Sequence, residues 1–224
     1  MKKLLFLLVL AVAIPACKGS GGTGPNLDIP TGTQGSGNAK TETRTLTGFK
    51  KIEAGGAVNI DVTFKPEFSV SVEADDNLLP QITTEVDGDT LKIATKDRIS
   101  TKSRVNIKIT MPRLTDFDLS GASTGTITGI TGDKLEAEIT GASKLTATGE
   151  MRELVARANG ASTIDAENLK TEKALAWAAG ASKITVTALD DLDVDASGAS
   201  TITYVGSPAK FKQNESGAST IRQK

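Results

Sequence analysis

The sequence predicts an all-β fold, a right-handed parallel β-helix or β-solenoid with coils of about 19 residues. The triplet Gly-Ala-Ser occurs six times in the second half of the chain, at intervals of 20, 19, 20, 18 and 19 residues. The copies begin at Gly121, Gly141, Gly160, Gly180, Gly198 and Gly217. Such a period is typical of a chain that winds and stacks each coil on the last. The expected hand is that of parallel strand connections in general.

Alternation of apolar and polar residues within each copy is the second observation. The clearest copies run over residues 135–145 and 192–202, and residues 154–164 and 174–184 follow the same scheme. Apolar residues share one parity in each copy, so they lie on one side of an extended chain, while Glu, Asp, Lys, Thr and Arg take the other. Each coil therefore has an inner side, a solvated side and a corner at Gly-Ala-Ser.

Strand patterns also precede the repeat. Residues 58–62, 68–72 and 105–109 alternate, and Leu91–Ile93 follows the turn signal Asp87-Gly88-Asp89. We therefore expect N-terminal strands that belong to the same domain as the coils, over residues 43–224.

The first residues read as an export signal. Lys2 and Lys3 precede eleven apolar residues from Leu4 to Ile14, too few to span a bilayer as a helix. The run ends near Cys17, the only cysteine, in a context that resembles a bacterial lipobox. We expect residues 1–17 to form a lipoprotein signal with Cys17 lipidated and retained as the mature N-terminus. The alternative is an ordinary cleaved signal with an incidental cysteine.

Residues 18–42 are rich in Gly, Ser and Thr, which predicts a flexible tether. The expected location is the cell envelope, with the chain anchored by lipid to the outer membrane of a Gram-negative bacterium. The expected partner at this end is thus the membrane itself.

The serines of the repeat allow two interpretations. If they keep the apolar parity, their hydroxyls point inward and bond to the serine of the neighbouring coil, forming a structural ladder. Alternatively they form an outward row that meets a ligand. We favour the ladder, which comprises Ser123, Ser143, Ser162, Ser182, Ser200 and Ser219.

The composition limits the chemistry. The chain has no histidine, so it lacks the commonest general base and metal ligand. Lipidation of Cys17 would leave no free thiol. A net charge of −1 argues against nucleic-acid binding. We expect no catalytic residues, no cofactor and no metal.

An acidic run provides a candidate ligand contact. Asp191, Asp193 and Asp195 share the solvated side at spacings of roughly 7 Å. Paired carboxylates bind Ca²⁺ or act as acid and base in glycoside hydrolysis. The alternative, which we favour, is a solvated edge that resists strand addition.

Trp177, the only tryptophan, is a second candidate because its parity is opposite to that of the neighbouring alanines. An exposed indole suits a sugar ring, but packing under a neighbouring segment is the interpretation we favour. The outward positions after the corners also include Thr124, Lys144, Thr163, Lys183, Thr201 and Thr220. This array either reflects strand propensity or meets a repetitive surface such as a glycan or another copy.

Residues 49–60 and 70–78, Leu91–Ile93, residues 105–112 and the recurring Ser-Gly-Ala-Ser together resemble the bacterial head GIN domain family of autotransporter adhesin heads. The resemblance covers about residues 43–224. It implies a β-helical fold and an envelope location, and it brings no catalytic residues.

The sequence thus predicts a non-enzymatic envelope lipoprotein whose solenoid acts in adhesion, binding or surface assembly, with a glycan or a surface protein as partner. One alternative is a carbohydrate-active β-helix that works with carboxylates. Another is a structural unit that docks or oligomerises through an open end of the solenoid, where the strand at Ser219–Ile221 is exposed.

Overall fold

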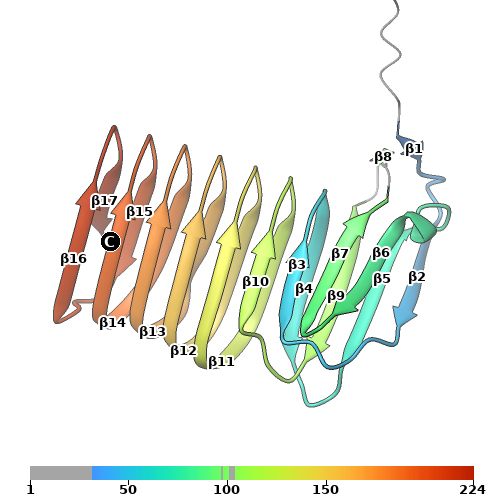
Figure 1. The fold of residues 1–224 in the computed structure, drawn as a ribbon, viewed down its shortest axis with the longest axis horizontal. Coiled ribbons are helices and arrows are strands. Elements are labelled where there is room, and N and C mark those ends of the chain that lie inside the picture. The colour runs from blue at the N-terminus through green and yellow to red at the C-terminus, as the bar shows by residue number, and fades with distance from the viewer. Residues whose placement is uncertain (1–31, 97, 101–103) are drawn as a thin grey trace, which may run out of the picture. The chain divides into compact units, whose positions relative to one another are not determined.

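The computed structural model describes residues 32–96, 98–100 and 104–224. It confirms the predicted β-solenoid: parallel strands stack coil upon coil through one continuous sheet (Figure 1). The repeat supplies β11 (Thr124–Ile139), β12 (Lys144–Ala158), β13 (Thr163–Ala178), β14 (Lys183–Ala196), β15 (Thr201–Val205), β16 (Lys210–Glu215) and β17 (Thr220–Gln223).

The preceding strands extend the same stack. They are β1 (Thr33–Gln34), β2 (Ala39–Arg44), β3 (Lys51–Ala54), β4 (Val58–Phe64), β5 (Ser69–Asp75), β6 (Ile82–Asp87), β7 (Thr90–Thr95), β8 (Ile99–Ser100), β9 (Val105–Met111) and β10 (Asp116–Leu119). A 3-10 turn at Leu79–Gln81 precedes β6. β4 and β3 continue the sheet at β11 and β10, so these strands share the domain of the coils, as expected.

Each long strand bends in the middle and contributes to two faces. Their first halves join β9, β4, β15 and β17 in a surface that we call the threonine face. Their second halves join β7, β3, β10 and β16 in a surface that we call the charged face. Register shifts mark the bends, for example between Ile127 and Ile130 and between Thr146 and Gly149. These irregularities absorb the variation in coil length.

The core lies between the two faces, and its residues have the parity that the sequence indicates. Leu145, Ile164, Ile184 and Ile202 stack in register behind the threonine face, and Ala137, Ala156, Ala176 and Val194 behind the charged face. Burying an Ile or Leu side chain contributes about 1.5–3 kcal/mol. The coils are therefore held together by columns of apolar side chains as well as by the main-chain ladder.

One coil breaks the column of branched residues for a packing reason. Gly125 occupies the position that Leu145 takes in the next coil. A Cβ at Gly125 would lie 2.6 Å from Cε1 of Phe117, which is fully buried. The glycine thus makes room for the phenyl ring.

The Gly-Ala-Ser corners stack main chain on main chain. Gly141 has φ +73, and its own Cβ would lie 2.5 Å from the carbonyl oxygen of Gly121. The amide of Ala142 donates to that oxygen at 2.8 Å, and Ala161 repeats the bond to Gly141. Both the left-handed φ and the close approach therefore require glycine at this corner.

The N-terminal end of the stack is closed by antiparallel strands, since β2 pairs with β5 and β6 pairs with β7. Arg44 reaches from β2 across the end of the core. Its guanidinium donates to the carbonyl oxygens of Ile82 at 2.6 Å and Leu79 at 3.2 Å, and to Thr84 Oγ1 at 3.0 Å. An inward charge on an edge strand also discourages strand addition.

The tether predicted over residues 18–42 overlaps with the folded domain, because part of this range forms paired strands. Thr33–Gln34 pairs with Ile99–Ser100, and Ala39–Arg44 runs along β5. The strand was overlooked because β2 has alternating Lys, Thr, Glu and Arg with no apolar residue inside it. Residues 1–31, including the expected signal and Cys17, lie outside the described residues. In the part of the chain that is described, no helix is long and apolar enough to cross a membrane.

Candidate binding faces

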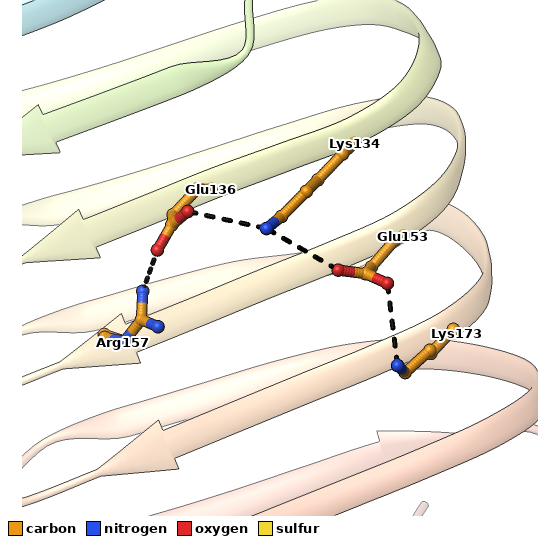
Figure 2. A network of polar contacts seen from close by, with 5 residues as sticks. All are labelled: Lys134, Glu136, Glu153, Arg157 and Lys173. Atoms are coloured by element: carbon orange, nitrogen blue, oxygen red, sulfur yellow. Dashed lines mark hydrogen bonds and ion pairs between the residues drawn. The ribbon is translucent and has the colours of Figure 1, made fainter.

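The charged face carries a row of alternating charges across the coils. Lys134, Glu153, Lys173, Asp191 and Lys210 are in register on five strands that neighbour one another in the sheet, β11 to β14 and β16. Figure 2 shows the first three of them with Glu136 and Arg157. Lys134 Nζ lies 3.7 Å from oxygens of both Glu136 and Glu153, and Lys173 Nζ lies 3.6 Å from Glu153. Each of these carboxylates thus binds cations from two coils, because Glu136 also pairs with Arg157.

Arg157 has two roles on this face. Its guanidinium donates to Glu136 and holds the pKa of that carboxyl below its usual value. The same guanidinium lies 5.0 Å from the centre of the Trp177 ring, in a cation–π contact. The ion pair and the ring together fix Arg157 between neighbouring coils.

This contact decides what Trp177 offers to a ligand. The indole is partly buried on the charged face, between Arg157 on β12 and Asp195 on β14. Arg157 covers the ring, so Trp177 does not present that side as a free platform for a sugar. Its neighbours on the two sides are Arg157 and Asp195 of the adjacent coils, and the neighbouring segment that contacts the ring is thus the preceding coil.

Asp191, Asp193 and Asp195 lie side by side on β14, as parity requires, but β14 is not an edge strand. β16 covers it in parallel register and places Lys210, Lys212 and Asn214 against the three acids. Lys212 Nζ lies 3.0 Å from Asp193, and Asn214 Nδ2 donates to Asp195 at 2.9 Å. The interpretation as a solvated edge is therefore wrong: these carboxylates attach the next coil.

No metal site is evident on these faces. Within residues 32–96, 98–100 and 104–224, no three acidic, His or Cys side chains converge as metal ligands would. The arrangement of Asp191, Asp193 and Asp195, two of them already engaged by β16, also does not resemble a pair of free catalytic carboxylates.

A second acidic group was not found from the sequence. Glu53, Asp118 and Glu138 come from β3, β10 and β11 and stand in register beside a hollow of about 270 Å³. Partial desolvation, followed by the charges of Glu138, Asp116, Glu53 and Glu136, raises the pKa of Asp118 to about 6. Residues so distant in sequence become neighbours only through the coil register, which no local motif signals.

The corner serines lie along the inside of the stack. Ser123, Ser143, Ser162, Ser182 and Ser200 are buried, and Ser219 in the last coil is partly buried. Their hydroxyl partners differ from the expected serine-to-serine bonds. Those of Ser182, Ser200 and Ser219 each donate at 3.0 Å to a main-chain carbonyl oxygen of the preceding coil, at Ala158, Ala178 and Ala196 respectively. A serine hydroxyl that bonds to a carbonyl oxygen satisfies its own proton. In a serine-to-serine ladder, the accepting hydroxyl would still need an acceptor for its proton.

The threonine face carries fewer charged side chains than the charged face. One row after the corners contains Thr124, Lys144, Thr163, Lys183, Thr201 and Thr220 in register. A second row, two residues further along each strand, contains Thr126, Thr146, Asp165, Thr185, Thr203 and Arg222. The structure thus arranges these residues as two parallel rows of hydroxyls interrupted by single charges, in which Thr185 and Thr203 of the second row are buried.

A stack of this kind, with in-register rows of polar side chains on both faces, defines a repetitive β-solenoid. Residues 48–208 match the model of the family described as "Putative auto-transporter adhesin, head GIN domain". The match covers well over half of the chain, and the chain belongs to this family.

Similar folds occur in solved structures. A "putative adhesin" from Bacteroides fragilis superposes with TM-score 0.71 at 24% identity, over 85% of this chain and 99% of that one. A "putative lipid binding protein" from Parabacteroides distasonis has TM-score 0.54 at 19% identity, over 85% and 98%. A "putative adhesin" from Parabacteroides merdae has TM-score 0.51 at 16% identity, over 86% and 98%. At these identities the likeness concerns the fold. No match was found among curated proteins.

The family and these neighbours are described as adhesins or binding proteins and not as enzymes. The family places the chain among proteins of the cell surface or envelope.

Proposed function

We propose that the chain is a non-enzymatic envelope lipoprotein, anchored through Cys17, that presents its solenoid as an adhesive binding domain. The observation that carries this proposal is the set of continuous polar rows, one described on the charged face and two on the threonine face. Their side chains repeat at the spacing of the coils, roughly 4.8 Å. Such a surface contacts an extended, repetitive partner better than a small substrate. The family description and the absence of histidine agree with this role.

The adhesive role is tested with cells that express the full chain. We expect them to adhere to an array of immobilised glycans more strongly than cells carrying the empty vector. The full chain with Cys17→Ala serves as the anchoring control, since it lacks the lipid that would retain the domain on the cell. Equal adhesion of all three strains to every glycan would contradict the proposal.

The anchor has its own test. Metabolic labelling with radioactive palmitate is expected to mark the wild-type chain and to be lost in Cys17→Ala, because only Cys17 can carry the lipid in this sequence. Label that persists in the variant would refute lipidation at this residue, whatever the result of the adhesion assay.

A further inference from the structure

The threonine face contains a cleft of about 380 Å³ near its C-terminal end. Four of its lining residues come from three successive strands: Lys183 and Thr185 on β14, Thr203 on β15 and Arg222 on β17. Thr185, Thr203 and Arg222 are in register, so they form a column that crosses the cleft. Lys183 lies two residues before Thr185, and the two cations thus flank the threonines diagonally.

The side chains that line the cleft carry a net positive charge. Glu167 and Lys224 also line it, and they neutralise each other because Lys224 Nζ lies 2.5 Å from Glu167 Oε1. Among the described residues, neither Lys183 nor Arg222 has a carboxylate partner within ion-pair distance. Two unneutralised cations therefore face the same hollow. Charge-assisted hydrogen bonds to an oxyanion are the interactions that such groups make most strongly.

Thr203 gives independent support for a ligand in this cleft. Thr203 is 7% exposed, and its Oγ1 is buried without a hydrogen-bond partner. A buried hydroxyl in this state is destabilising, since it has lost water without replacing it. Rotation about χ1 exchanges the positions of the Thr203 hydroxyl and methyl group between staggered rotamers. Turned toward the cleft, the hydroxyl gains an acceptor when a ligand oxygen is present.

We propose that this cleft binds the carboxylate or sulfate group of an acidic glycan, an inference that rests on the proposed adhesive function. Lys183 and Arg222 hold the anionic group from two sides, and Thr203 donates to it from the floor of the cleft. Partly buried threonines beside the cleft, Thr163 and Thr201, continue the row and suit the hydroxyl groups of adjoining sugar residues.

The surrounding surface favours a glycan over a lipid bilayer. The large apolar side chains that stand exposed in the described ranges are Leu189 and Phe211. Phe211 on β16 is in register with the buried Leu192 and packs beside Tyr204 at the open end of the core, and Leu189 lies at the bend of β14, so neither belongs to the outward rows of the threonine face. Membrane-surface binding needs apolar side chains that enter the interface or a denser basic patch.

The test is calorimetric titration of the purified full-length chain with tetragalacturonate. Its methyl ester, which keeps the sugars and removes the charge, is the matched probe. We expect the acid to bind and the ester to bind at least about tenfold more weakly, as loss of charge-assisted hydrogen bonds predicts. Inorganic sulfate is expected to compete for the site while binding more weakly than the oligosaccharide. Equal affinity for acid and ester overturns the proposal, as does sulfate that binds as tightly as the oligosaccharide.

Variants locate the site. Lys183→Gln and Arg222→Gln are each expected to weaken binding about tenfold. Lys144→Gln is the matched control, because Lys144 occupies the same row two coils away and does not line the cleft. Thr203→Val is expected to weaken binding without lowering the melting temperature, since it removes an unpartnered hydroxyl. An equal loss in Lys144→Gln would refute the assignment, as would unaltered binding in Thr203→Val.

The remaining outcomes separate this inference from the adhesive function. If tetragalacturonate binds as described but expressing cells do not adhere, the cleft stands and the adhesive function fails. If cells adhere equally well with the Lys183→Gln/Arg222→Gln double variant, the function stands and the cleft fails. Binding of the chain to phosphatidylglycerol vesicles, dependent on Lys183 and Arg222 and without any affinity for the oligosaccharide, would also overturn the inference.

Discussion

At the scale of single residues, a corner glycine meets two requirements, a positive φ and the absence of a side chain. Comparison with a turn glycine that meets only the first separates them by mutation. Gly88 and Gly141 both have positive φ, at +61 and +73. A Cβ on Gly88 meets nothing within 4 Å, whereas one on Gly141 would lie 2.5 Å from a main-chain oxygen. The turn glycine therefore needs only conformational freedom, and the corner glycine also needs the absence of a side chain.

Alanine at these two positions is expected to have unequal costs. Gly88→Ala should lower the free energy of unfolding by about 1–2 kcal/mol, the cost of a left-handed residue. Gly141→Ala should cost more than about 2 kcal/mol, because the oxygen of Gly121 must also move. Urea unfolding of both variants measures the difference. Equal costs would show that the corners are not in main-chain contact.

Asp118 makes stability depend on pH. Its pKa in the folded chain, about 6, is above the ordinary value of 3.8, so the folded state holds the proton more tightly. Its contribution to stability is therefore complete below pH 3.8 and is lost as pH rises through about 6. Asp118→Asn is expected to flatten this decline and to stabilise the chain at pH 7 by less than about 1 kcal/mol, because Asp118 is only partly desolvated and solvent still screens its charge.

Carboxyl NMR titration provides the direct check. Wild-type Asp118 should titrate near pH 6, and Glu138→Gln should lower its pKa because Glu138 is the strongest neighbouring charge. A wild-type titration at the ordinary value of 3.8 would show that the stacked carboxylates do not interact.

At the scale of elements, ion pairs reinforce the apolar columns between coils. Glu153 on β12 pairs with Lys134 on β11 and Lys173 on β13, so a single carboxylate links three coils. Glu150 on the same strand has one pair, with Lys170, and its side chain is 72% exposed. Networks contribute more than isolated exposed pairs, which are worth 0–1 kcal/mol in most cases.

Glutamine substitutions test this ranking. Glu153→Gln should lower the free energy of unfolding by about 1 kcal/mol, and Glu150→Gln by less than about 0.5 kcal/mol. The difference should shrink in 1 M salt, where exposed charges are screened. Denaturant unfolding at two salt concentrations measures both effects, and a Glu153→Gln cost that ignores salt would point to packing instead of charge.

How well the elements could be predicted depends on whether a feature lies within one coil or between coils. Apolar parity is a local property, so the sequence identified the core positions, the corners and the outward rows. Contacts between coils depend on register, and the register shifts at bends such as Thr146/Gly149 leave no clear pattern in the sequence. This is why the group of Glu53, Asp118 and Glu138 was missed and why Asp191–Asp195 was assigned to an edge. The cleft at Thr203 has the same origin, since its lining residues come from four coils.

At the scale of the whole described stack, the two ends differ. Arg44 and antiparallel strands close the N-terminal end, whereas β16 at the other end is exposed along its length and Phe211 is 43% exposed. The outward Lys210 of β16 complements Glu85 on β6, the edge strand at the opposite end of the same face, whereas Lys212 and Asp87 already pair within the chain with Asp193 and Lys92. This complementarity favours head-to-tail contact between copies of the chain.

Sedimentation velocity tests this contact. The full-length chain in detergent is expected to increase in size with concentration, and Phe211→Ser should abolish the increase by removing apolar area from the edge. Leu189→Ser is the control, since Leu189 is 52% exposed but lies at a bend away from the edge. Loss of association in both variants, or in neither, would contradict contact through β16.

Because glycine stacks on glycine at the corners, the length of the solenoid can change by whole coils. Because the Gly-Ala-Ser corners repeat the same main-chain contact from coil to coil, a coil that carries this triplet meets the same corner on either side. Genetic change can then add or remove a coil as a unit, and it can alter the outward rows while the interior columns stay constant. A lineage built in this way can adjust its reach and its surface chemistry independently of each other.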